Sequence, residues 1–108
     1  MTAQQPARTH PRHQLDDALL TPVRFSTMAA LSNGSEVDFA TLRNIIETDD
    51  SALSKAIARL DTAHYIAVRK GYVANKPRTW LRATPAGLKA LRTHSAALQA
   101  ITNIQIAP

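Results

Sequence analysis

The sequence predicts a mainly α fold with a small β-hairpin (α+β), in which three helices are followed by two strands and one long helix. Apolar residues recur three or four positions apart before residue 61 and again after residue 84, the spacing of a buried helix face. Between these regions, two short runs are rich in β-branched and aromatic residues. A threonine followed by a proline, a common helix start, precedes both the first and the last helix.

The composition is that of one ordinary globular domain. The chain has 108 residues, of which 44% are hydrophobic and 19% are charged. Cysteine is missing, which excludes disulfides and thiolate metal sites and agrees with a reducing cytoplasm. Apolar runs stay well short of the roughly 20 residues of a membrane span, and the first residues lack the apolar region of a secretory signal. We therefore expect a cytoplasmic protein.

The charges are distributed very unevenly along the chain. All eight acidic residues lie between Asp16 and Asp61, so residues 1–61 carry a net charge of −2. After Asp61 there are seven basic residues and no acidic one, a net charge of +7. This asymmetry indicates a polyanionic partner for the second half of the chain, and a solvated basic surface is the simpler alternative.

Residues 1–14 are polar and show no apolar period, which predicts a flexible basic arm before a domain over 15–108. Such an arm either contacts DNA or is a plain disordered terminus. His10 and His13 are three residues apart, but Pro11 between them argues against a helix and no third ligand is near. We therefore expect no metal site.

The first two helices follow a short amphipathic piece at 15–20. Thr21-Pro22 starts the first helix, and the residues at 32–34, Ser-Asn-Gly, end it. A brief extended segment at 37–39 leads to the second helix, for which Asp38 is the expected cap. The residues expected to face inward are Val23, Met28 and Leu31 in the first helix, and Phe39, Leu42, Ile45 and Ile46 in the second.

The third helix, about residues 50–63 after a break at 48–50, has two different sides. Leu53, Ile57 and Leu60 recur at i, i+4 and i+7 and form a stripe that must be buried. The opposite side carries small or hydrogen-bonding residues and two positive charges: Ser51, Ser54, Lys55, Ala58 and Arg59. A helix with one buried side and one such side, in a basic domain, is suited to a DNA groove.

The residues after 63 predict two strands, at 65–70 and 79–83, joined by a basic turn at 71–78 that contains glycine, asparagine and proline. Three closely spaced helices followed by such a hairpin make a helix-turn-helix unit with a wing at about 69–80. Thr84-Pro85 then opens a last helix over about 84–103. Its exposed apolar side predicts dimerisation through Leu88, Leu91, Leu98 and Ile101.

Several short motifs occur in a characteristic order and cover roughly residues 15–98. They are Leu15-Asp16, Pro22-Val23-Arg24-Phe25, Phe39-Ala40-Thr41-Leu42-Arg43, Leu53-Ser54-Lys55, Leu60 with Ala63, Tyr65-Ile66, Lys76-Pro77-Arg78-Thr79 and Thr84-Pro85-Ala86-Gly87. In this order the chain resembles the winged helix-turn-helix transcriptional regulators of the MarR/ArsR type. It is most similar to the small single-domain winged-helix DNA-binding family.

The chain departs from the pattern of that family at three places, which include four residues. His64 stands where the family has a glycine at the end of the third helix, a position that suits a left-handed backbone. Asn75 replaces a wing glycine and is the next best residue for such a turn. Ser51-Ala52 replaces a Gly-Asn pair, so the base preference of the family does not carry over.

The resemblance implies that the third helix is a recognition helix in the major groove. Ser51, Ser54 and Lys55 would then lie in the groove and Arg59 on a base or phosphate. The remaining candidate DNA contacts are cations expected on backbone or in the minor groove: Arg43, Arg69, Lys70, Lys76 and Arg78. For Arg43 and Arg69, an exposed charge without a partner is an equal alternative.

Three other residues are assigned by their surroundings. Arg24 lies on a helix that otherwise faces inward and is expected to pair with Asp16 or Asp17. Trp80 is expected in the core rather than stacked on a base. For Tyr72 the sequence does not decide between these two alternatives.

The sequence thus predicts a sequence-specific regulator of transcription, a repressor that binds double-stranded DNA as a homodimer on a pseudo-palindromic operator. The alternative is a winged helix that binds an acidic protein partner, and RNA binding is disfavoured because exposed stacking aromatics are lacking. We expect no enzyme and no cofactor, since no phosphate loop, metal cluster or nucleophile–base pair is present in the sequence. A small-molecule effector is not indicated by any motif.

Overall fold

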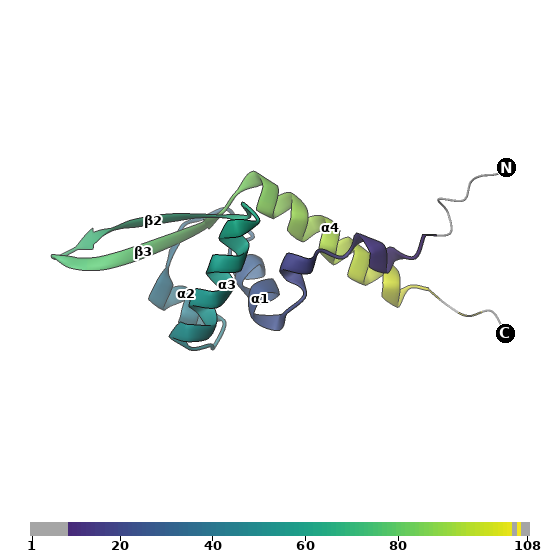
Figure 1. Ribbon diagram of the computed structural model, residues 1–108, viewed down its shortest axis with the longest axis horizontal. Coiled ribbons are helices and arrows are strands. Elements are labelled where there is room, and N and C mark those ends of the chain that lie inside the picture. Colours follow the sequence, from purple (N-terminus) through teal and green to yellow (C-terminus); the bar gives the residue numbers. More distant parts are fainter. Residues whose placement is uncertain (1–8, 105, 107–108) are drawn as a thin grey trace.

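The computed structural model describes residues 9–104 and 106 and confirms the predicted fold class (Figure 1). Within these described residues, two short 3₁₀ helices precede four α-helices and three strands. In chain order the elements are η2 (Pro11–Gln14), η3 (Asp17–Leu19), α1 (Pro22–Ala30), β1 (Val37–Asp38), α2 (Phe39–Ile45), α3 (Asp50–Thr62), β2 (Ile66–Val73), β3 (Lys76–Ala83) and α4 (Pro85–Thr102).

The molecule is elongated, because the β2–β3 hairpin and α4 extend in opposite directions from a body made of α1, α2 and α3 (Figure 1). The short helix η2 runs beside the second half of α4, so the first described residues lie at the same end of the molecule as the end of α4. The wing is at the opposite end.

Each α-helix begins at a side chain that accepts a hydrogen bond from the first turn. Thr21 and Thr84 cap α1 and α4 and are followed by proline, while Asp38 and Asp49 cap α2 and α3. These side chains satisfy backbone N–H groups that have no partner inside the helix. All four helix starts agree with the sequence prediction.

The core forms where α1, α2, α3 and the base of the sheet meet. Its fully buried side chains include Met28, Leu31, Leu42, Leu53 and Leu60, with Leu81 from β3. The predicted core position of Ile45 is wrong: Ile45 is 57% exposed, because α2 is short and ends there, while Ile46 packs against the core from the following turn.

The sheet has the strand order β1-β3-β2, and both pairs are antiparallel. The hairpin is longer than predicted, since β2 and β3 each have eight residues and only Ala74 and Asn75 form the turn. Both turn residues have positive φ, 50° and 66°, the geometry of a type I′ turn, which keeps long strands in register. Pro77 fits in β3 because β1 ends before it, so β3 has a single neighbour there.

His64, at the end of α3, adopts the left-handed geometry that the family pattern assigns to glycine. Its φ is 63°. Its backbone carbonyl accepts a hydrogen bond of 2.7 Å from the Thr84 hydroxyl, so the end of α3 is tied to the start of α4. This contact helps to offset the cost of a side chain in that backbone region.

The chain before α1 is more ordered than predicted, because the arm expected over residues 1–14 includes structured residues. Residues 1–8 lie outside the described part, but Pro11–Gln14 forms η2, whose first turn is capped by the His10 side chain, and η2 contacts α4. The order has a local cause: proline starts the turn and α4 offers small residues, Ala96, Ala97 and Ala100, beside it.

The segment between η2 and α1 is held by polar contacts with the rest of the domain. The Asp16 carboxylate accepts a hydrogen bond from the Tyr65 hydroxyl, and its backbone N–H donates to His94 Nδ1 at 3.0 Å. Arg24 is structural, as predicted, but its expected acidic partners are wrong. It donates to the backbone carbonyls of Asp17 and Ala18 at 3.0 and 2.8 Å, because these carbonyls of η3 are within reach of the Arg24 guanidinium.

Candidate nucleic-acid interface

The exposed side of α3 carries the residues that the sequence assigns to DNA. Ser51, Ser54, Lys55 and Arg59 are all exposed. Leu53, Ala56 and Leu60 are buried on the opposite side, against α1 and β2. Helical periodicity separates the two sets, so the packing of one side orients the other outwards.

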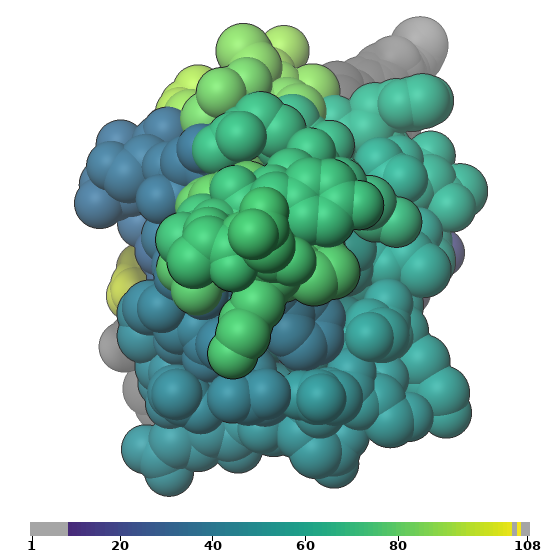
Figure 2. Space-filling view, turned by 90° about the vertical axis from the view of Figure 1, so that its left-hand side faces the viewer, coloured from purple at the N-terminus to yellow at the C-terminus, as the bar shows by residue number. Residues whose placement is uncertain are grey.

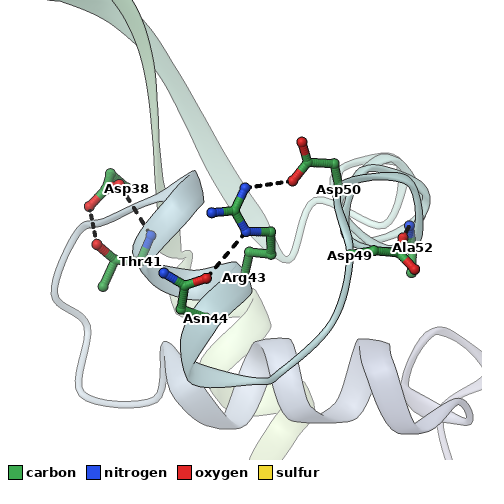
Figure 3. A network of polar contacts seen from close by, with 7 residues as sticks. All are labelled: Asp38, Thr41, Arg43, Asn44, Asp49, Asp50 and Ala52. Carbon is green, nitrogen blue, oxygen red and sulfur yellow. Dashed lines mark hydrogen bonds and ion pairs between the residues drawn. The ribbon is translucent and has the colours of Figure 1, made fainter.

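The N-terminus of α3 is braced against α2 by a cluster of polar side chains (Figure 3). Asp49 caps the helix by accepting from Ala52 N at 2.7 Å. Asp50, in the first turn, pairs with Arg43 of α2 across 2.7 Å, and Arg43 Nε also donates to Asn44 at 3.3 Å. Arg43 therefore joins the two helices of the helix-turn-helix unit, which the sequence did not indicate.

A second polar contact fixes the start of α2 next to the sheet. The Asp38 carboxylate accepts from the Thr41 backbone N–H at 3.2 Å and from the Thr41 hydroxyl at 2.5 Å (Figure 3). The Thr41 hydroxyl bond is the main cause that lowers the pKa of Asp38 below its ordinary value, and burial opposes this shift. The ionised carboxylate is therefore the form that caps α2.

Strand alternation divides the predicted wing cations between the two faces of the hairpin. We call the face that carries Val68, Lys70 and Thr79 the inner face, because these residues line a groove with α3. Residues one position along each strand point the other way, to the outer face. The predicted DNA contacts on the outer face are Arg69, Lys76 and Arg78, and Lys70 is the one on the inner face.

The groove between α3 and the inner face has a volume of about 660 Å³. Ser54, Ala58 and Asp61 line it from α3, and Lys70 and Thr79 line it from the hairpin. Seen along the hairpin from its tip, the wing stands in front of the body beside the surface of α2 and α3 (Figure 2). One recognition-helix candidate, Ser54, and one wing cation, Lys70, thus border a shared concave surface.

Two predicted DNA-contact residues already have acidic partners. Arg43 pairs with Asp50, and Arg69 forms two hydrogen bonds with Glu36, of 2.9 and 2.8 Å. The Glu36 partner lies 33 positions earlier in the chain, so sequence spacing contained no signal for this pair.

The predicted dimerisation residues of α4 differ in exposure. Leu91 is buried and Leu88 is half-buried, and both pack in or against the core of the same chain. Leu98 is 37% exposed, Ile101 is half-buried, and the following Ile104 is 51% exposed. The outward apolar surface of α4 is therefore confined to its second half, because the first half covers the core.

Two other features are absent from the described residues. Between residues 9 and 104, no group of three or more His, Asp or Glu side chains is placed to hold a metal ion. The same residues include no helix that is long and apolar enough to cross a membrane.

Comparisons with known proteins agree with this geometry. The sequence model described as "Winged helix DNA-binding domain" matches residues 23–102. No match is found among curated proteins.

Several solved structures of transcriptional regulators have the same fold. A transcriptional regulator homologue from Pyrococcus horikoshii is 20% identical, with a TM-score of 0.76 over 85% of this chain and 92% of its own. A MarR family regulator from Silicibacter pomeroyi is 19% identical, with a TM-score of 0.64 over 87% of this chain, which spans 62% of that protein.

A third structure, the PcaV transcriptional regulator from Streptomyces coelicolor in complex with its natural ligand, is 20% identical. Its TM-score is 0.66 over 94% of this chain and 81% of its own.

At these identities the structures establish the shared fold. The sequence model, which covers most of the chain from α1 to the end of α4, establishes the family, one of DNA-binding domains and not of enzymes. The chain belongs to the winged helix DNA-binding domain family.

Proposed function

We propose that the protein is a sequence-specific regulator of transcription, a repressor that binds double-stranded DNA as a homodimer. The main support is that the exposed polar side of α3 and the acid-free hairpin border the same groove. A duplex with α3 in its major groove would pass its sugar–phosphate backbone along that groove towards the wing. Because such a regulator works on DNA, we also propose a cytoplasmic location.

In this proposal the exposed residues of α3 and the wing have separate tasks. Ser51, Ser54 and Lys55 face base edges in the major groove, and Arg59 contacts a base or the adjacent phosphate. Serine discriminates weakly between bases, so much of the affinity comes from the cations of the wing. Those assigned to backbone or minor groove are Lys70, Lys76 and Arg78.

Arg43 keeps a place in the proposed interface despite its pairing with Asp50. Its Nε and Nη1 donate to Asn44 and Asp50, whereas Nη2 makes no hydrogen bond to any residue that the structure describes. A guanidinium can bind two anions from different sides, so Nη2 is available for a phosphate next to α3.

The proposed dimer forms through the second half of α4. Leu98, Ile101 and Ile104 supply its apolar surface, and Leu20, 53% exposed, adds to it from the turn before α1. A two-fold axis through this surface would place two recognition helices on successive major grooves, about 34 Å apart. The operator would then be a pseudo-palindrome.

Selection of bound duplexes from a random DNA pool tests this proposal. We expect enriched inverted repeats, and we expect the double substitution Lys55→Ala and Arg59→Ala to abolish specific binding. A matched control is Lys89→Ala with Arg92→Ala, which removes the same charge from exposed positions of α4. Unchanged operator affinity in the α3 double variant would refute the assignment of the recognition helix.

The salt dependence of binding separates DNA from the alternative, an acidic protein partner. The logarithm of the DNA association constant should fall by about 0.9 per phosphate contact for each tenfold increase in salt. Selection that yields no enriched duplex, together with tight binding to an acidic protein, would replace the proposal with the alternative.

A further inference from the structure

Three side chains form a compact cluster on the outer face of the wing, near its base. Glu36, from the segment between α1 and β1, receives two hydrogen bonds from the Arg69 guanidinium of β2. Arg69 also lies over the indole of Trp80 in β3, with 4.0 Å between its Cζ atom and the ring centroid. The paired register of Arg69 and Trp80 across the two strands makes this stacking possible.

The indole of Trp80 is half-buried, which differs from the predicted place in the core. Gly71 allows the ring to lie close to β2, because a Cβ atom at that position would be 3.0 Å from Trp80 Cζ3. The ring is therefore packed against the backbone of β2 and covered by Arg69. Glu36 connects this packed pair to the body of the domain.

We propose that Glu36, Arg69 and Trp80 form a clamp that sets the direction of the wing relative to α3. In this inference, which rests on the proposed DNA binding, Arg69 is a positioning residue and its neighbour Lys70 makes the phosphate contact of β2. The two adjacent cations would then do different work, because Arg69 is held by Glu36 and Trp80 whereas Lys70 faces the groove with α3.

The geometry of the clamp favours Glu36 over a phosphate as the partner of Arg69. The guanidinium meets the carboxylate through both Nε and Nη2, the bidentate arrangement that an arginine also uses for phosphate. Transfer of Arg69 to DNA would replace one such contact by another and leave the Glu36 carboxylate unpaired near a polyanion. The exchange would therefore gain little and add a repulsion.

Other charges near Glu36 act in the same direction. Arg82 of β3 also lies near Glu36 and adds a favourable charge interaction. The bond from Arg69 is the main cause that lowers the pKa of Glu36, and the same bond raises the pKa of Arg69. Both groups are therefore charged at neutral pH, and the clamp is closed there.

Lys70 is placed differently from Arg69. It lines the groove between α3 and the hairpin, across from Ser54 and Ala58, where the DNA backbone would pass. Its ammonium group is a flexible point charge, which suits a phosphate whose position is set by the helix and the wing.

The fluorescence of Trp80 tests the clamp without DNA, because it is the only tryptophan in the chain. Glu36→Gln should release Arg69 from the indole and change the emission at neutral pH, while far-UV circular dichroism stays that of the folded protein. On acidification, wild-type emission should change below the ordinary carboxyl range as Glu36 is protonated, and this transition should be missing in Glu36→Gln.

A conservative variant distinguishes the clamp from simple charge pairing. Arg69→Lys keeps the charge but loses the planar fork, so it should show the same altered emission as Glu36→Gln. Emission of Glu36→Gln that equals the wild type at neutral pH would overturn the clamp. This result does not depend on whether the protein binds DNA.

The salt dependence of duplex binding tests the division of work between the two cations. The slope is that of the logarithm of the association constant against the logarithm of the salt concentration. Lys70→Gln should make its magnitude smaller by about 0.9, the value for one phosphate, whereas Arg69→Gln should lower affinity without changing the slope. Glu36→Gln should make the magnitude larger by about 0.9, because Arg69 becomes free to contact a phosphate.

A reduced slope for Arg69→Gln, equal to that of Lys70→Gln, would overturn the positioning role and return Arg69 to the DNA contacts. Absence of any duplex binding by the wild type would instead refute the proposed function, and the fluorescence of Trp80 would still decide whether the clamp exists.

Discussion

His94 is a titratable side chain in the interior of this protein. It is 2% exposed, its Nδ1 accepts a hydrogen bond from the Asp16 backbone at 3.0 Å, and its ring centroid is 5.4 Å from that of Phe25. Burial lowers its pKa, because the imidazolium is poorly solvated there, and the Asp16 carboxylate opposes the shift only partly. The neutral ring therefore joins α4 to the segment before α1.

This lowered pKa predicts a pH dependence of stability. The unfolded chain, with a histidine pKa of about 6.5, takes up a proton that the folded protein resists, so unfolding becomes easier as pH falls below that value. The contribution is fully present above the unfolded pKa and is lost as pH falls towards the folded pKa. Urea unfolding between pH 8 and 5 should show this loss.

The matched variant is His94→Asn, whose side-chain oxygen can accept the hydrogen bond from Asp16 but does not titrate. Its free energy of unfolding should fall less steeply over the same pH range. Equal slopes for the two proteins would show that His94 is not the group responsible.

At the scale of elements, the hairpin turn is strained by its own sequence. Ala74 and Asn75 both have positive φ, a backbone region that costs an alanine roughly 1–2 kcal/mol. The turn keeps this geometry because the eight paired positions of β2 and β3 leave only residues 74 and 75 to connect the two strands.

Replacing the turn by the preferred pair, Ala74→Asn with Asn75→Gly, should therefore stabilise the protein. We expect a gain of about 1 kcal/mol in the free energy of unfolding, measured by urea denaturation. Asn75→Ala should have the opposite effect, since it adds a second alanine with positive φ. A stabilising effect of Asn75→Ala would contradict the turn geometry.

The start of α4 depends on a close approach of two backbones. A Cβ atom on Gly87 would lie 2.1 Å from the Tyr65 carbonyl oxygen and 2.9 Å from Met28 Cε. The Tyr65 carbonyl also accepts a hydrogen bond of 3.0 Å from Thr84 N, so it cannot move away freely. Gly87 thus lets α4 begin directly against the end of α3.

Gly87→Ala should destabilise the protein by about 3 kcal/mol or more, the upper range for an overpacked position. Thermal and urea unfolding would measure it. Ala86→Gly, at an exposed position of the same turn, is the control, with an expected cost of at most about 1 kcal/mol from helix propensity. Similar costs for the two variants would show that the contact with Tyr65 can relax.

At the scale of the whole molecule, the two ends of its long axis have different characters. The wing end is basic, because acidic residues stop at Asp61, whereas the outer end of α4 presents apolar residues. In the proposed function, one end contacts DNA and the other contacts a second copy. Each end can therefore be altered separately.

Leu98→Glu should dissociate the proposed dimer, because it places a charge in the apolar surface of α4. Sedimentation at micromolar concentration should show a monomer, and affinity for a full inverted repeat should fall towards that for a half-site. Gln99→Glu, at the neighbouring exposed position, is the control for the added charge. A monomeric wild type under the same conditions would refute the dimer.

Much of this fold could be predicted from local signals in the sequence. The sequence signal for a helix cap lies within one helical turn, which is why the caps could be predicted: Thr21, Asp38, Asp49 and Thr84. The spacing of apolar residues likewise predicts the buried side of α3. The lengths of the strands were harder to predict from the sequence, because the position of the turn at 74–75 follows from the paired strands and not from its own residues. Ile45 was misassigned since the period of α2 does not show where the helix leaves the core.

The sequence by itself determined the order of the elements, the exposed polar side of α3 and the separation of acidic from basic residues, because these depend on neighbours within a few positions. The tertiary structure decided the partners of the charges. Glu36 meets Arg69, and Asp16 meets Tyr65 and His94, through contacts between residues 33 to 78 positions apart. Such pairs depend on how helices and strands pack against one another, so a basic residue that reads as a DNA contact can be part of the wing's own support.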